Sequence, residues 1–225
     1  MKQKTMSLIS ILSIIIAIVL ISCNKNNSVK YIADFSPNAF SKLITNNPNN
    51  WEVLNEDGED VLHLIQKGEF GEIRKPSSYA FIMDVDAADF ELTLDAKCLS
   101  DTSIKGRDVI VYFGVQDTLH FYYVHLSNEV HKYHNVIGIV NGQDRVPIAN
   151  TLDNPLSARI IDYEWHKVKI NRDVKSYSIK IFVDDMEKPI FSIIDSALTH
   201  GGFGVGSFDD FGKFKNLELR YNNNL

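Results

Sequence analysis

Two neighbouring runs of this 225-residue chain decide its fold: Asp108-Val-Ile-Val-Tyr-Phe-Gly-Val-Gln116 and Leu119-His-Phe-Tyr-Tyr-Val-His-Leu126. Both are rich in β-branched and aromatic residues, and only a short polar turn separates them. They therefore predict an antiparallel β-hairpin. Because side chains alternate between the two faces of a strand, Phe121, Tyr123 and His125 are expected on one face.

The same alternation extends outward from this hairpin over most of the chain. Further runs of this kind cover residues 89–99, 165–171, 177–183 and 213–220. Clusters of Gly, Asp, Asn and Pro separate the runs, and helix signals are nearly absent. Roughly a dozen short strands of this kind predict an all-β fold in which two antiparallel sheets pack as a β-sandwich or jelly roll. We expect one such domain, over residues 31–225.

The N-terminus has the composition of an export signal. A basic head with Lys2 and Lys4 precedes an apolar run that is too short and wrongly flanked for a membrane span. The run ends in Leu20-Ile21-Ser22-Cys23, which resembles the bacterial lipobox and implies removal of residues 1–22 and lipidation of Cys23. Residues 23–30 would then form the lipidated end and a polar tether. The alternative is an uncleaved signal anchor. We expect an exported protein that a lipid anchor holds at a bacterial membrane, at the outer membrane or cell surface.

Charge and cysteine content exclude several classes of partner. Residues 1–22 contain two lysines and no acid, so the mature chain has 21 basic and 29 acidic side chains, a net charge of −8. Such a balance argues against a nucleic-acid partner, which normally binds a basic surface. Cys98 is the one cysteine left after lipidation, so no internal disulfide is expected, and its place in an apolar pattern predicts a buried side chain. We expect a monomer.

Four segments carry a resemblance to the concanavalin A-like lectin and glucanase superfamily, which includes laminin-G-like modules. They are Trp165-His-Lys-Val-Lys-Ile170, Ile179-Lys-Ile-Phe-Val-Asp-Asp185, Gly202-Phe-Gly-Val-Gly-Ser-Phe-Asp-Asp210 and Phe214-Lys-Asn-Leu-Glu-Leu219. Over residues 50–221 the resemblance implies a two-sheet jelly roll with a concave sheet on which sugars commonly bind. A carbohydrate is therefore the expected partner.

One departure from that superfamily bears on the reaction. Its family-16-type glycosidases carry Glu-x-Asp-x-x-Glu on one strand, and this spacing is absent from the sequence. A retaining hydrolase needs two carboxyl groups about 5 Å apart. The nearest acidic groups, Asp84-Val-Asp86 and Asp184-Asp185-Met-Glu187, fall at expected strand ends. Hydrolysis by that route is disfavoured, and a glycoside hydrolase stays an alternative only.

The chemistry-bearing side chains gather between Leu119 and Arg145. Four of the seven histidines fall between positions 120 and 134. The catalytic interpretation assigns acid–base roles to His125, Tyr123 and His134 and substrate-binding roles to Arg145, Asn135, Tyr133 and His131. Jelly-roll polysaccharide lyases use residues of these types, which implies abstraction of the C5 proton of a uronate and β-elimination at C4. His125 or Tyr123 would supply base and acid. The leaving group is a sugar or a hydroxyl, so a lyase and a dehydratase both remain open.

Other interpretations of the same residues also remain open. These histidines and aromatics are ordinary side chains if the chain is a non-catalytic carbohydrate-binding module or a laminin-G-like interaction protein. A zinc site built from His125, His131 and His134 would suit imidazole ligands, although the spacing matches no known signature. Asp209-Asp210 would ligate calcium or, as we favour, form a solvated turn. We expect no cofactor and no metal, with calcium or zinc as the alternatives.

Overall fold

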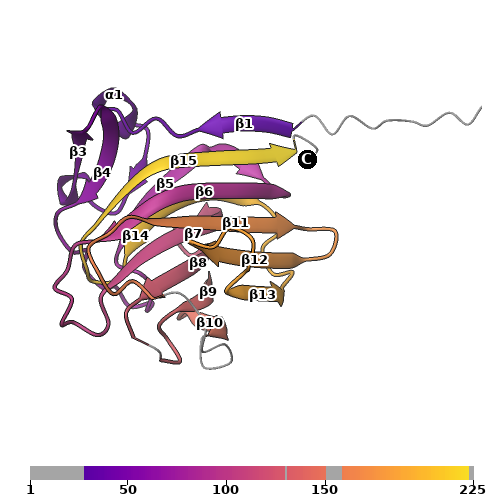
Figure 1. Ribbon diagram of the computed structural model, residues 1–225. Coiled ribbons are helices and arrows are strands. Elements are labelled where there is room, and N and C mark those ends of the chain that lie inside the picture. Colours follow the sequence, from indigo (N-terminus) through magenta and orange to yellow (C-terminus); the bar gives the residue numbers. More distant parts are fainter. Residues whose placement is uncertain (1–27, 130, 151–158, 223–225) are drawn as a thin grey trace, which may run out of the picture.

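The protein is described by a computed structural model that covers residues 28–129, 131–150 and 159–222 (Figure 1). The predicted signal segment, the predicted lipidation site Cys23 and most of the predicted tether lie outside these residues. No helix in the described part of the chain has the length and apolar character needed to cross a membrane.

Strands dominate the chain, as the alternating runs predict. The elements are β1 (Ser28–Ile32), α1 (Pro37–Phe40), β2 (Ile44–Thr45), a 3-10 turn η1 (Pro48–Asn50), β3 (Trp51–Glu56), β4 (Glu59–Leu64), β5 (Ser78–Ala87), β6 (Phe90–Cys98), β7 (Asp108–Asp117), β8 (His120–Ser127), β9 (Val136–Asn141), β10 (Val146–Asn150), β11 (His166–Asp173), β12 (Ser178–Val183), β13 (Phe191–Ile194), β14 (Gly201–Ser207) and β15 (Gly212–Asn222).

The strands form two antiparallel sheets, which confirms the predicted sandwich (Figure 1). One sheet has eight strands in the order β13-β12-β11-β6-β15-β4-β3, with β1 also paired to β15. The other has seven strands in the order β10-β9-β8-β7-β14-β5-β2. The predicted hairpin is β7 and β8, at the centre of the seven-stranded sheet, with Ile110 opposite His125.

Between the sheets lies the main hydrophobic core. The seven-stranded sheet contributes Val111 and Phe113 of β7 with Tyr122 and Val124 of β8, all at most 1% exposed. The eight-stranded sheet contributes Leu92, Leu94, Val168 and Ile170, which are fully buried. Cys98 is a free thiol in this core, as predicted, and burial raises its pKa to about 11.

A second hydrophobic cluster lies on the other side of the seven-stranded sheet. This outer cluster consists of Phe81, Ile110, Tyr112, Val115, Phe121, Tyr123, Val136, Val140 and Phe208. It holds the alternate side chains of β7 and β8, so Phe121 and Tyr123 share a face as expected, and His125 packs against Phe208 of the same cluster. Residues 65–77, which we call the covering segment, connect β4 to β5 and pack Ile73 against this outer cluster.

Candidate functional site

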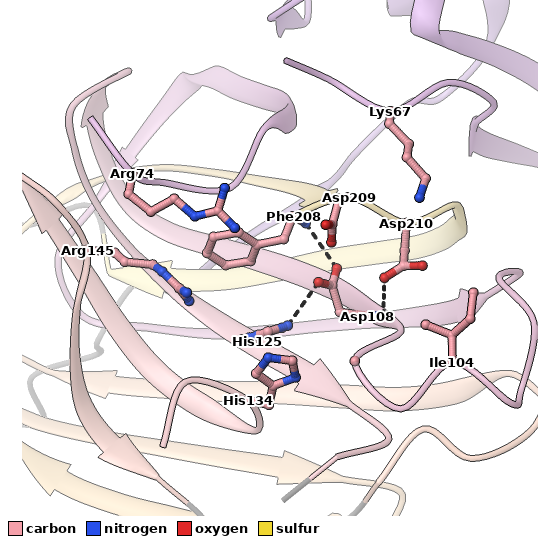
Figure 2. A pocket seen from close by; sticks show the side chains of 11 residues that line it. Lys67, Arg74, Ile104, Asp108, His125, His134, Arg145, Phe208, Asp209 and Asp210 are labelled. Carbon is pink, nitrogen blue, oxygen red and sulfur yellow. Dashed lines mark hydrogen bonds and ion pairs between the residues drawn. The ribbon is translucent and has the colours of Figure 1, made fainter. Parts of the chain in front are cut away.

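A polar pocket opens where β7 begins and where β8 and β14 end (Figure 2). Its cavity volume is about 240 Å³. The polar wall consists of the cations Lys67, Arg74 and Arg145, the imidazoles of His125 and His134, and the carboxyl groups of Asp108, Asp209 and Asp210. Ile104, Gly106 and Phe208 complete the lining. In Figure 2 the two arginines lie on one side of the pocket, and Asp210 and Lys67 lie on the opposite side.

The floor of the pocket is a buried pair formed by Asp108 and His125, each 1% exposed. Oδ2 of Asp108 lies 2.9 Å from Nε2 of His125, and Nδ1 of the same ring lies 2.8 Å from the carbonyl oxygen of Tyr133. Both partners are hydrogen-bond acceptors when Asp108 is ionised, so both ring nitrogens donate and His125 has no free lone pair. Oδ1 of Asp108 accepts from the Ser207 hydroxyl at 2.5 Å and from the Phe208 amide at 3.0 Å. The pair is therefore suited to fixing the floor rather than to taking a proton.

His134 lies beside this floor and differs from His125 in its protonation state and in its hydrogen-bond partners. Its ring centroid is 5.0 Å from that of His125. Burial and the positive charge of His125 lower the pKa of His134 to about 4, so the ring is neutral at pH 7. Nδ1 lies 3.3 Å from the Ser127 hydroxyl and 3.6 Å from a carboxylate oxygen of Glu129. With the hydrogen on Nδ1, Nε2 presents its lone pair, and it has no hydrogen-bond partner among the described residues.

Two arginines occupy fixed positions at one end of the pocket. The guanidinium carbon of Arg145 is 4.3 Å from the ring centroid of Phe208 and 4.8 Å from that of Tyr133. The guanidinium carbon of Arg74 is 3.6 Å from the Phe70 centroid and 5.6 Å from that of Phe208. Stacking on an aromatic face fixes the plane of a guanidinium group while leaving its N–H edge available.

Neither arginine has a carboxylate partner within the part of the chain that the structure describes. Nη1 of Arg145 is buried, and the guanidinium group lies near the hydroxyl of Tyr123. The backbone ties the two residues together, since the Arg145 amide donates to the Arg74 carbonyl at 2.9 Å. Two stacked guanidinium groups without an acidic partner form a receptor for an anion such as a carboxylate.

The opposite end of the pocket is acidic. Asp209 is exposed, whereas Asp210 is 3% exposed and accepts a hydrogen bond from the Asp108 amide at 3.0 Å. Burial, together with the negative charge of Asp108, raises the pKa of Asp210 to about 6. One oxygen from each of these three carboxyl groups lies within 4.8 Å of the others, so this trio has the spacing of a cation site. His125, in contrast, has both nitrogens engaged and is a poor zinc ligand.

The structure brings together three of the predicted site residues, His125, His134 and Arg145, in one pocket. Tyr133 supports them, because its carbonyl accepts from His125 and its ring stacks under Arg145. His131 is exposed, with its ring centroid 5.4 Å from that of His134.

Tyr123 and Asn135 lie beneath the pocket rather than in its lining. Tyr123 is fully buried, and burial raises the pKa of its hydroxyl to about 12, although the nearby guanidinium of Arg145 acts to lower that pKa. Asn135 is also fully buried, and its side-chain amide hydrogen-bonds to the backbone. Nδ2 donates to the carbonyls of Ser127 and Glu129, and Oδ1 accepts from the Ser127 amide. The amide of Asn135 is therefore already satisfied, and this residue shapes the β8–β9 turn.

Sequence reasoning missed Asp108, Arg74 and Lys67. Asp108 carried a usable signal. It lies two and four residues before Ile110 and Tyr112, so it is a charged residue on the strand face that these apolar side chains share. Arg74 and Lys67 belong to the irregular covering segment, where no periodic pattern indicates which way a side chain points.

Comparison with known proteins adds information on the fold. No protein-family model matches the sequence, and no curated protein matches it in a sequence search. Among solved structures, the chain is similar to the carbohydrate binding module CBM66 from Bacillus subtilis, with a TM-score of 0.54 and 16% identity over 79% of this chain and 94% of that one. It is also similar to a lectin from Bauhinia forficata in complex with GalNAc, with a TM-score of 0.50 and 10% identity over 86% of this chain and 97% of that one.

Both likenesses concern the fold, because the identities are low. They agree with the two-sheet β-sandwich and with the fold implied by the resemblance of residues 50–221 described above. The chain has a jelly-roll β-sandwich fold.

Proposed function

We propose that this chain is a carbohydrate-active protein that binds a uronate-containing saccharide in the pocket and acts on it by β-elimination, as a carbon–oxygen lyase or dehydratase. One arrangement carries the proposal: two arginines without an acidic partner among the described residues, each held over an aromatic ring, line the same small pocket as the neutral imidazole of His134. The carbohydrate class is supported by structures of the same fold, a carbohydrate binding module and a lectin in complex with GalNAc.

The arginines would perform the first task of the reaction. The C5 proton of a uronate becomes acidic enough to remove only when the adjacent carboxylate is neutralised. Arg74 and Arg145 can hold the two carboxylate oxygens through charge-assisted hydrogen bonds and stabilise the charge that develops there.

His134 would perform the proton transfer. Nε2 takes the C5 proton, the electrons of the C5–H bond form the C4=C5 double bond, and the bond between C4 and its oxygen breaks. Protonated His134 then returns the proton to the leaving oxygen, so one imidazole serves as base and acid on one face of the sugar. This assignment moves the base from His125 or Tyr123, the sequence-based candidates, because His125 donates from both nitrogens and the Tyr123 hydroxyl is buried.

Two variants separate catalysis from binding. We expect His134→Gln still to bind a uronate oligosaccharide. The rate at which absorbance at 235 nm rises, which reports the unsaturated uronate, should fall by at least about 100-fold. We expect Arg145→Gln to lose both binding and turnover. His120→Gln is the matched control, since His120 pairs with Asp117 and lies outside the pocket lining. Full activity of His134→Gln would contradict the mechanism.

Non-catalytic binding is the second candidate function, and one feature favours it. Of the acid–base residues expected from the sequence, His134 alone keeps a nitrogen unpaired among the described residues, because His125 is engaged on both sides and Tyr123 is buried. On this alternative the wild-type protein binds the uronate oligosaccharide without forming any unsaturated product.

We also propose that the protein is exported and attached to a bacterial membrane, at the outer membrane or cell surface, through lipid on Cys23. The support is the apolar N-terminal run and its lipobox-like end.

A further inference from the structure

Buried side chains fill the middle of the face of the seven-stranded sheet that carries the outer cluster, which leaves little room there for a sugar. Phe81, Tyr112 and Phe121 occupy the middle of this face, and each is at most 1% exposed. Phe81 and Tyr112 meet edge to face with a centroid separation of 5.0 Å, and Tyr112 and Phe121 do so at 5.3 Å. A saccharide cannot lie across rings that are already buried.

Two separate hollows remain at opposite ends of this face. The pocket with His134 lies at the start of β7, whereas a second hollow of about 300 Å³ is lined by Met83, Gln116 and His200 near the far end of β7. The outer cluster lies between the two hollows. The described residues therefore do not form one continuous groove along this face.

The covering segment is a fixed wall of the pocket. Its Gly68 amide donates to the Ser78 hydroxyl at 2.8 Å, and a Cβ on Gly68 would lie 2.1 Å from the Ser77 carbonyl oxygen, so only glycine fits there. Further along, the Arg74 amide donates to the Asp144 carboxylate at 2.8 Å. These bonds hold the segment against both the β5 strand and the β9–β10 loop.

The β6–β7 loop and the β8–β9 turn, which form another wall of the pocket, are in close contact. A Cβ added to Gly106 would lie 2.9 Å from Cε1 of His134, so the β6–β7 loop touches the β8–β9 turn. The pocket volume of about 240 Å³ falls below the roughly 300–1,000 Å³ of pockets that bury drug-sized ligands. A space of this size suits one sugar ring.

We infer that the pocket takes the terminal residue of an acidic saccharide, one ring deep, and does not thread an internal stretch of a chain. This inference rests on the proposed function, since it assumes that the ligand is a uronate. The protein would then be exo-acting. Each chain end would supply one binding residue, so binding and rate would depend on the concentration of chain ends.

The test compares equal masses of a uronate polymer and of its hexamer. We expect both the initial rate at 235 nm and the molar binding capacity in titration calorimetry to follow the concentration of chain ends, and the viscosity of the polymer to stay nearly constant early in the reaction. Equal rates per mass with rapid loss of viscosity would overturn the inference. If no unsaturated product forms, the proposed elimination fails, and the titration alone still decides whether chain ends are recognised.

A variant at the rim provides an independent check. Ile104 lines the pocket and is 46% exposed, so Ile104→Ala widens the mouth without opening the core. We expect it to raise the ratio of activity or binding on polymer to that on hexamer by several-fold. Ile161→Ala is the control, because Ile161 is 52% exposed and lies outside the pocket lining. An unchanged ratio in Ile104→Ala would count against a narrow mouth that admits one residue.

Discussion

Replacing Asp108 with alanine tests whether the buried Asp108–His125 pair organises the pocket. Asp108 accepts hydrogen bonds from His125 Nε2, the Ser207 hydroxyl and the Phe208 amide, and it is 1% exposed. Alanine would leave all three donors buried without an acceptor. Because losing one partner of a buried ion pair costs about 3–5 kcal/mol, we expect the free energy of unfolding to fall by that amount.

The effect is large enough to measure by thermal unfolding. In a domain of this size about 1 kcal/mol corresponds to about 2–4 °C in Tm, so Asp108→Ala should lower Tm by about 6–20 °C. Asp108→Asn should cost less, because the amide oxygen can still accept from Ser207 and Phe208 while its N–H₂ donates to a neutral His125.

Asp209→Ala is the matched control, since Asp209 is the exposed neighbour in the same pocket. We expect its free energy of unfolding to change by no more than about 0.5 kcal/mol. If Asp108→Ala lowers Tm no more than Asp209→Ala does, Asp108 does not hold the floor of the pocket.

Four further perturbations test the pocket, the residues beneath it and the lipid anchor separately. Since protonation removes the lone pair of His134 and its pKa is about 4, kcat/KM should fall as the pH drops through about 4; a fall centred near 6.5 would point to an unperturbed histidine. Asn135→Ala should lower the free energy of unfolding by roughly 2–4 kcal/mol, measured in urea, because two backbone carbonyls and one amide lose their partner. Gly138→Ala, whose Cβ would lie 2.2 Å from Cζ of Tyr123, should cost about 1–3 kcal/mol and weaken uronate binding as the ring shifts; unchanged binding would show that Tyr123 does not support the pocket. If lipid on Cys23 anchors the protein, Cys23→Ser should move it from the membrane fraction to the soluble fraction, and retention in the membrane would contradict lipid anchoring.

Much of the fold could be predicted from the sequence, because period-two alternation directly reports which residues face a sheet's interior. The hairpin of β7 and β8 and the shared face of Phe121 and Tyr123 follow from that pattern alone. Alternation does not reveal which strands become neighbours. The pairing of β14 with β7, which brings Phe208 over His125, joins residues far apart in the chain.

The site was predictable only in part, for related physical reasons. His125, His134 and Arg145 come from consecutive segments, so their proximity follows from short connections. Arg74 comes from the covering segment, whose path depends on packing against the outer cluster and not on a local pattern. The role of Asn135 was also not predictable from the sequence. An asparagine in a turn can hydrogen-bond to the backbone, as here, or to a ligand, and the sequence around it looks the same in both cases.

On the proposed function, this pocket recognises the carboxylate of an acidic saccharide. Titration calorimetry of one uronate oligosaccharide and of its carboxyl-reduced form, which keeps the shape and loses the charge, tests it most directly. Two charge-assisted hydrogen bonds, each of about 1.5–3 kcal/mol, predict binding weaker by at least about 100-fold for the reduced form. Equal affinity for the two saccharides would contradict the account.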